Sequence, residues 1–173
     1  MLFTNDDELA DIIRSIRIHG GGADKYDNVR LGFNGRLDTI QAAVLLEKLE
    51  IFDDEVISRN KVAKRYSSNI NESIKSPHIP DGYLSSWAQY SIILPKNLER
   101  QSIMDKLKSN EIPTMVYYRI PLHLQRVFYN FGYKKGDFPV SEKISKKILS
   151  LPMHPYLDEQ NQNRVLNAIS DLD

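Results

Sequence analysis

The sequence predicts a mixed α/β chain in two parts, the end of a larger domain at residues 1–71 and a small α+β domain at residues 72–173. In the first part, apolar residues recur at helical spacing after a short strand-like start. The composition changes near Asn71, beyond which Pro77 and Pro80 introduce turns. The remaining residues, about a hundred, mix strand and helix patterns, which is the ordinary size and make-up of a small domain.

The first expected helix follows residues 1–4, which have the composition of the last residues of a strand. Asn5 and Glu8 have the spacing of a capping box at its start, and His19 and Gly20 end it. Its apolar residues share one face: Leu9, Ile12, Ile13 and Ile16.

The second expected helix runs from Thr39 to about Leu49, with Asp38 as its N-cap. Apolar residues cover most of its circumference, which predicts that it is buried between layers. A third helix, over residues 52–70, has one apolar stripe and charged residues elsewhere, so we expect it to be half solvated.

The second part is expected to begin with a half-buried strand, because residues 88–94 alternate apolar and polar side chains and Pro95 closes the run. The elements expected after it are a helix over 97–109, a strand over 112–120, an aromatic-rich loop with a short helix over 121–137, a helix over 140–148, a short strand or extended turn over 150–157, and a final helix capped by Asp158 and containing Leu172.

Composition excludes several classes of function. The chain has 23 basic and 23 acidic side chains, so it lacks the basic surplus that nucleic acids or anionic membranes require of a partner. It contains no cysteine, which excludes disulfides and thiolate chemistry and suits a cytoplasmic location. The sequence has no signal-peptide pattern and no apolar run long enough to span a bilayer.

Short motifs alone indicate no catalytic centre. The four histidines have neither HxxxH nor HExxH spacing, so no metal site is expected. The glycines at 20–22 lack the context of a dinucleotide or P-loop motif, which favours a mobile loop. No Ser/His/Asp arrangement can be argued from the spacing, and no residue of this chain is assigned a catalytic role.

Two residues before the second helix, Asn34 and Arg36, have two possible interpretations. They belong to the segment GFNGRLDTIQAAVLLEKL, residues 32–49. Backbone N–H groups at a helix start favour an anion, and an amide and a guanidinium add donors for phosphate or carboxylate. The alternative is a purely structural turn in which Asn34 bonds its own chain and Arg36 pairs with an aspartate.

Adjacent tyrosines at the end of the expected strand over 112–120 form a second candidate. Tyr117 and Tyr118 point to opposite sides if the segment is extended, so one can join the core while the other offers a hydroxyl group to a ligand. The alternative is that both are structural aromatics.

Four segments together resemble a known family. They are MLFTNDDELADIIRSIRIHG, GFNGRLDTIQAAVLLEKL, IPTMVYYRIPLHLQ and GDFPVSEKISKKILSLPMHPYL, in this order. They are similar to the C-terminal portion of the DegT-type sugar-nucleotide aminotransferases, which are pyridoxal-phosphate enzymes of fold type I in the aspartate-aminotransferase superfamily. The resemblance covers nearly the whole chain.

The resemblance implies a role for each candidate. In the family, a large α/β domain carries the cofactor, a small C-terminal domain closes over it, and two subunits build each site. Asn34 would reach the cofactor phosphate of the neighbouring subunit, and Arg36 would hold an anionic part of the substrate. Tyr117 and Tyr118 would line the substrate pocket. His123 and Gln125 would lie close by.

The resemblance also implies a missing part. The Schiff-base lysine, the aspartate at the pyridine nitrogen and the aromatic that stacks on the ring belong to the portion of the family fold before residue 1. We therefore expect the chain alone to be inactive.

Two hypotheses follow from the resemblance. The first is part of a homodimeric cytoplasmic aminotransferase that shares pyridoxal 5′-phosphate with an N-terminal portion and moves an amino group, from a donor such as glutamate, to a nucleotide-linked keto-sugar for surface polysaccharide or a related glycan. A UDP-linked 3-keto uronic acid is one possible substrate. The second is a truncated, non-catalytic product that only dimerises or binds a nucleotide sugar.

Overall fold

The computed structural model describes residues 2–24 and 26–170, which form two compact units divided between Ile51 and Phe52. This division lies earlier in the chain than the domain boundary expected at residue 71. The reason is that α3 (Phe52–Asn69) buries Val62, Ala63 and Tyr66 in the core of the second unit.

The first unit contains two helices, α1 (Asp7–Arg17) and α2 (Thr39–Glu50). Helix α1 starts one residue later than expected, because Asp6 rather than Asn5 is its N-cap and its side chain accepts a hydrogen bond from the Leu9 N–H. Residues 2–4 form no strand in the described structure, and Met1, the first residue of the expected strand end, lies outside the described residues.

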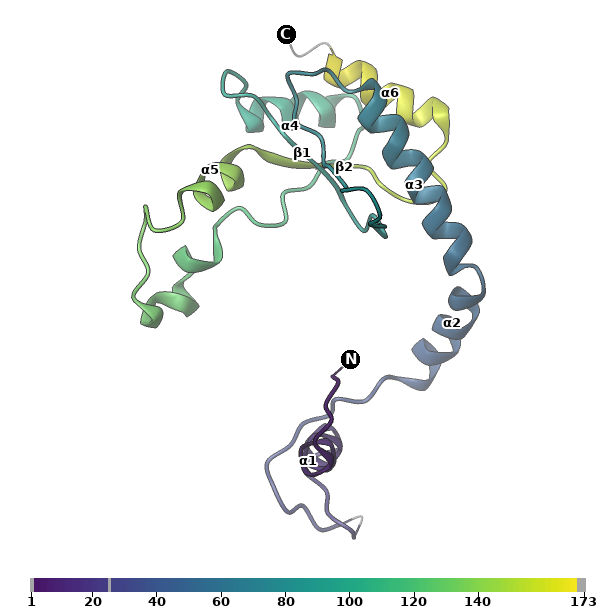
Figure 1. The fold of residues 1–173 in the computed structure, drawn as a ribbon, viewed down its shortest axis with the longest axis vertical. Coiled ribbons are helices and arrows are strands. Elements are labelled where there is room, and N and C mark those ends of the chain that lie inside the picture. Colours follow the sequence, from purple (N-terminus) through teal and green to yellow (C-terminus); the bar gives the residue numbers. More distant parts are fainter. Residues whose placement is uncertain (1, 25, 171–173) are drawn as a thin grey trace. The chain divides into compact units, whose positions relative to one another are not determined.

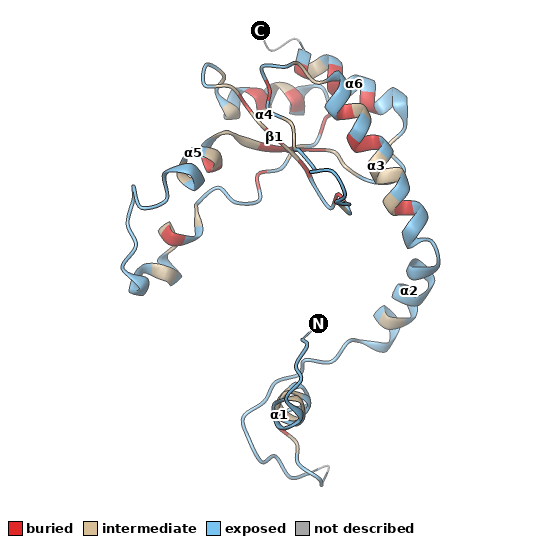
Figure 2. Ribbon diagram, in the orientation of Figure 1, coloured by how far each residue is buried: buried red, intermediate tan, exposed pale blue. Residues whose placement is uncertain are grey.

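Apolar side chains of the first unit are largely exposed. Among its described residues, only Gly20 is buried, and Ile40 of α2 is 77% exposed. The other large apolar residues of α2 that are exposed are Val44, Leu45, Leu46 and Leu49. Helix α2 has the expected bounds and cap, but the expectation that it is buried between layers is wrong for this chain, because these side chains remain exposed (Figure 2).

The second unit is built on two antiparallel strands, β1 (Tyr90–Ile93) and β2 (Ile148–Leu151). Tyr90 pairs with Leu151 and Ile92 with Leu149, and all four side chains are buried on one face. That face packs against residues from α3, α4 (Arg100–Ser109) and α6 (Glu159–Ser170), as Figures 1 and 2 show. A single hydrophobic core therefore holds the second unit together.

The expected strand over 112–120 is reduced to a single bridge. Met115 and Ser150 exchange backbone hydrogen bonds of 3.1 and 2.8 Å, and no ladder extends beyond them among the described residues. Pro113 has no N–H group to donate, which prevents a longer ladder on that side. The following residues form two short 3₁₀ helices, η1 (Leu122–Leu124) and η2 (Arg126–Phe131).

Helix α5 (Pro139–Lys147) leads directly into β2. Pro139 stands at its first turn, where a missing N–H costs nothing. Asp158 caps α6 as expected, since its Oδ1 accepts from the Asn161 N–H at 2.7 Å. Leu172 of the expected final helix lies outside the described residues.

None of the helices in the described part of the chain is both long enough and apolar enough to cross a membrane.

The buried sheet face provides the first prediction. We expect Leu149→Ala to lower the free energy of unfolding of the second unit by about 2–5 kcal/mol, because Leu149 is fully buried and the substitution leaves a cavity. Leu84→Ala is the matched control, since Leu84 is 77% exposed and its loss should change stability by less than about 0.5 kcal/mol. Urea denaturation followed by tryptophan fluorescence measures both, and equal effects would contradict the prediction.

Candidate functional site

The turn that precedes α2 is attached to the end of α1 by backbone hydrogen bonds. Phe33 donates to the Ile16 carbonyl at 3.0 Å, His19 donates to the Phe33 carbonyl at 3.1 Å, and Gly35 donates to the Arg17 carbonyl at 2.9 Å. Because these bonds satisfy backbone groups at the end of α1, they fix the turn at residues 32–35.

Glycine is required at position 32 by close backbone approach. A Cβ on Gly32 would lie 2.0 Å from the Gly20 nitrogen and 2.3 Å from the His19 carbonyl carbon. Gly20 is similarly constrained, because it has a φ of +76° and its Cβ would lie 1.8 Å from the Arg30 carbonyl oxygen. The glycines thus allow the two stretches of backbone to pack directly on each other.

Asn34 and Arg36, presented by this turn, contact each other. The Arg36 Nε donates to Asn34 Oδ1 at 3.2 Å, and both residues are exposed. Asn34 thus bonds its own chain, as in the structural alternative, but the observed partner of Arg36 is Asn34 rather than an aspartate. The Asn34 amide N–H groups and the other Arg36 N–H groups are donors of the kind that suits a phosphate or carboxylate.

We expected the backbone N–H groups at the start of α2 to be further donors for an anion, but two of them already have a partner. Asp38 Oδ1 accepts from the N–H groups of Ile40 at 2.9 Å and Gln41 at 3.3 Å. These N–H groups are therefore already bonded to a carboxylate, so any anion selectivity here depends on the side chains of Asn34 and Arg36.

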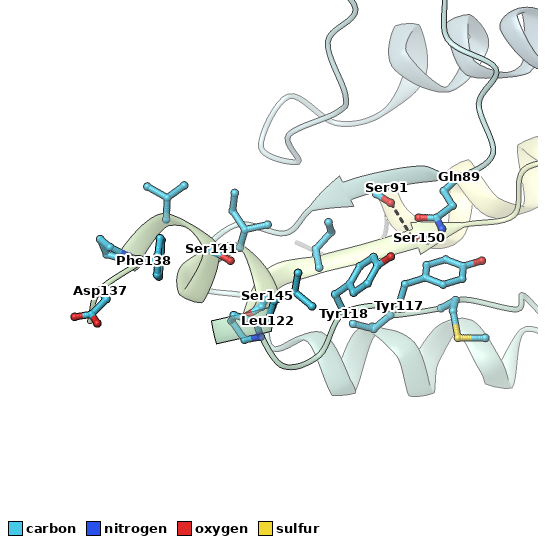
Figure 3. A pocket seen from close by; sticks show the side chains of 17 residues that line it. Gln89, Ser91, Tyr117, Tyr118, Leu122, Asp137, Phe138, Ser141, Ser145 and Ser150 are labelled. Carbon is cyan, nitrogen blue, oxygen red and sulfur yellow. Dashed lines mark hydrogen bonds between the residues drawn. The ribbon is translucent and has the colours of Figure 1, made fainter. Parts of the chain in front are cut away.

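A cavity of about 760 Å³ lies in the second unit, on the side of the sheet where Ser91 and Ser150 are paired (Figure 3). Tyr117 and Tyr118 both line it, and both are exposed. The remaining walls come from Gln89, Ser91, Met115, Val116, Pro121, Leu122, Asp137, Phe138, Pro139, Val140, Ser141, Ile144, Ser145, Ile148 and Ser150. Neither tyrosine belongs to the buried core, so the expectation that one of them joins it is wrong.

The cavity wall is mostly apolar and carries little charge. Among the described residues that line it, Asp137 is the only charged one, and none is a lysine or arginine. Its polar groups include the hydroxyls of Ser91 and Ser150, which are hydrogen bonded to each other at 2.8 Å. Such a wall suits a neutral ring with hydroxyl or amide groups, and it provides no cation to neutralise a diphosphate or carboxylate.

His123 and Gln125 do not line this cavity. His123 is only 8% exposed, and its Nε2 lies 3.1 Å from Glu142 Oε1. Gln125 donates from Nε2 to the Ile120 carbonyl at 3.3 Å. The sequence analysis did not single out Glu142. The signal available was its place in the first turn of α5, three residues after Pro139.

The pKa of Glu142 lies below its ordinary value. The main cause is the Gly136 N–H, which donates to Glu142 Oε1 at 2.7 Å and stabilises the charged form. Partial burial acts in the opposite direction, and the hydrogen bond to His123 lowers the pKa further.

This shift predicts a loss of stability in acid. Because the folded pKa of Glu142 is lowered, its contribution is present above the unfolded value of about 4.3 and is lost as the pH falls through the folded pKa. We expect Glu142→Gln to destabilise the chain most near neutral pH, with the difference from the parent shrinking below about pH 4. Urea denaturation across this range tests it, with exposed Glu72→Gln as control. A difference that does not depend on pH would contradict it.

The glycine contact provides a further prediction. Gly32→Ala should open the turn and speed amide exchange at His19 and Gly35 by at least about tenfold, because a backbone clash of this kind costs about 1–3 kcal/mol. Gly21→Ala is the control, since a Cβ there would meet only the Ile18 carbonyl oxygen at 3.4 Å. Hydrogen exchange read by NMR measures both. Equal exchange in the two variants would show that the close approach does not hold the turn.

Metal-ligating residues do not cluster in the described ranges. Residues 2–24 and 26–170 contain no group of three or more His, Cys, Asp or Glu side chains arranged to hold a metal ion.

The fold is shared with solved aminotransferase structures. The crystal structure of a DegT DnrJ EryC1 StrS aminotransferase from Brucella abortus is 48% identical and superimposes with a TM-score of 0.86, covering 98% of this chain and 44% of that one. The expected fold class, part of a fold type I pyridoxal-phosphate transferase, is thereby confirmed. The model of the DegT/DnrJ/EryC1/StrS aminotransferase family matches residues 1–170, and the chain belongs to this family.

Two curated relatives match almost the whole chain. The UDP-2-acetamido-2-deoxy-3-oxo-D-glucuronate aminotransferase of Pseudomonas aeruginosa is 41% identical over 171 residues, which are 98% of this chain and 46% of the relative. The pleiotropic regulatory protein of Geobacillus stearothermophilus is 43% identical over 175 residues, in an alignment that covers 99% of this chain and 46% of the relative. The chain therefore spans about half the length of the curated relatives it matches.

Proposed function

We propose that this chain is the C-terminal portion of a pyridoxal-phosphate-dependent aminotransferase that transfers an amino group to a nucleotide-linked keto-sugar for surface polysaccharide or a related glycan. The observation that carries the proposal is the 41% identity, over 98% of the chain, to an aminotransferase named for a UDP-linked 3-oxo-glucuronate. A substrate of this type, a UDP-linked 3-keto uronic acid, is the one we favour. In this proposal residues 1–71 end the large domain and residues 72–173 form the small one.

The proposed cofactor contact is made by Asn34. Its exposed amide can donate to a phosphate oxygen, and in the homodimer that we propose this phosphate belongs to the neighbouring subunit's cofactor. When bound, pyridoxal phosphate supplies the electron sink for the reaction, which the protein alone does not have. In our proposal the lysine that binds it covalently lies outside this chain, so the chain by itself does not carry out the transfer.

The substrate's neutral and anionic parts are proposed to use different residues. Tyr117 and Tyr118 offer hydroxyl groups at a mostly uncharged cavity, which suits the sugar or the base. The guanidinium of Arg36 would bind a carboxylate or phosphate oxygen. Gln125 does not line the cavity, so we propose that it contacts the substrate only at the edge of the cavity. Glutamate is the proposed amino donor.

The first test identifies the protein that carries this sequence in its source cells. Antibodies against a peptide from the chain recover it, borohydride reduction fixes any cofactor to its lysine, and mass spectrometry gives the intact mass. We expect a species, or a complex, much heavier than 20.0 kDa with a reduced pyridoxyl-lysine. The recovered protein should aminate a UDP-linked 3-keto uronic acid with glutamate as donor.

The opposite result is equally specific. A 20.0 kDa protein recovered without cofactor and without a lysine-bearing partner would overturn the catalytic proposal. It would favour the alternative of a non-catalytic module that dimerises or binds a nucleotide sugar.

Asn34 provides a prediction for the cofactor. In the active assembly, Asn34→Ala should weaken binding of pyridoxal phosphate by about tenfold, and Asn34→Asp by more, because a carboxylate repels the phosphate. Cofactor absorbance during equilibrium dialysis measures the Kd. Asn97→Ala, an exposed residue of the second unit, is the control. Unchanged affinity in both Asn34 variants would exclude the phosphate contact.

A further inference from the structure

One carboxylate oxygen joins two segments at the edge of the cavity. Oε1 of Glu142 accepts from the Gly136 N–H at 2.7 Å and lies 3.1 Å from Nε2 of His123. Both side chains of the pair are largely buried, with 7% of His123 and 14% of Glu142 exposed. Removal of either partner should lower stability, because the remaining partner would keep a buried polar group without a hydrogen bond.

The two joined segments each contribute residues to the cavity wall. Pro121 and Leu122, which line the cavity, directly precede His123. Asp137 and Phe138, which also line it, follow Gly136. The pair of His123 and Glu142 therefore connects one part of the wall to another.

Aromatic packing strengthens the same connection. The His123 ring lies 4.7 Å from the Phe138 ring, centre to centre, with the planes tilted by 54°. Tyr133 meets Phe138 edge-on, with centroids 5.1 Å apart. Phe138 is thus held between His123 and Tyr133, and it is the residue of this group that reaches the cavity wall.

Gly136 has a backbone conformation that serves this arrangement. Its φ is +102°, which L side chains rarely adopt, and no atom lies within 4 Å of where a Cβ would be. Glycine is needed here for the backbone angle rather than for space. At this angle its N–H donates to Glu142, while the Asp137 side chain accepts from the Lys134 N–H at 2.9 Å and closes the turn.

We propose that His123 and Glu142 act as positioning residues, forming a latch that holds the segment 133–138 against 121–124 and so sets the shape of the cavity wall at Phe138 and Leu122. His123 does this without touching the ligand. The inference deepens the proposed function, on which the identity of the ligand rests, whereas the latch itself rests on the contacts within the second unit. His123 is therefore a determinant of substrate fit that acts through Phe138.

The test compares variants of the full 173-residue chain by NMR. His123→Ala and Glu142→Gln should each speed exchange of the Gly136 amide by at least about tenfold, because each weakens the bonds at Oε1. His123→Gln keeps an N–H donor near the place of Nε2 and should restore most of the protection. His78→Ala, at an exposed histidine outside the cavity wall, should change nothing. The Ile92 amide, in the core strand, reports whether each variant is folded.

Ligand binding is read in the same samples with two probes, uridine and UDP-glucuronic acid. In the parent chain we expect at least one of them to shift the signals of Tyr117 and Tyr118. The latch variants should weaken that binding by about tenfold, with His123→Gln close to the parent.

The outcomes separate the latch from the proposed function. Unchanged Gly136 exchange in folded His123→Ala and Glu142→Gln chains would overturn the latch. Weaker binding with unchanged exchange would also overturn it, because His123 would then act by touching the ligand. If the two variants exchange faster at Gly136 but the parent chain binds neither probe, the latch is supported and the result counts against the proposed function.

If His123→Ala does not fold, Glu142→Gln decides alone. This variant preserves the shape of the side chain and removes only its charge, so a folded product is expected.

Discussion

Burial of one face of the β1–β2 sheet is the constraint on which the second unit depends. Tyr90 lies in that face, with its ring 5.0 Å from that of Tyr66 and 5.6 Å from that of Trp87. The buried hydroxyls have partners, since Tyr66 donates to the Pro152 carbonyl at 3.2 Å and Tyr90 bonds Ser67 at 2.8 Å. Burial raises the pKa of both tyrosines. Because strand side chains alternate, the same register puts Ser91 and Ser150 on the other face, beside the cavity.

The first unit is held together by a different kind of interaction. Its turn is fixed by backbone hydrogen bonds to the end of α1 and by the contact of Gly32 with the backbone at His19 and Gly20, while most of its apolar side chains stay exposed. Backbone bonds supply direction but only a modest net free energy, so they do not replace a hydrophobic core. An exposed apolar surface such as that of α2 is of the kind that proteins cover in their assemblies.

Charge is distributed unevenly between the two candidate sites. Asn34 and Arg36 are donors on an exposed turn, whereas the cavity of the second unit has Asp137 as the one charged residue among the described residues of its wall. A nucleotide sugar contains both a neutral ring and an anionic diphosphate, so recognition of such a molecule requires both kinds of surface. His123 of the PLHLQ segment does not line that cavity, and its Nε2 lies 3.1 Å from Glu142 Oε1.

Much of this protein was determined by local sequence. The sequence predicted the cap at Asp38, the bounds of α2, the strand pattern at residues 90–93 and the family resemblance. These features depend on residues close together in the chain, whose chemistry sets capping, periodicity and turns.

Only the tertiary structure decided the rest. Three contacts join residues far apart in the chain: Gly32 against Gly20, Met115 with Ser150, and His123 with Glu142. Neither periodicity nor spacing predicts such pairs, because each pair forms only when the fold brings distant parts of the backbone together. For the same reason, the apolar pattern of α2 predicted an interior position, whereas the structure leaves α2 exposed. The structure also shows the carboxylate of Glu142 as the partner of His123.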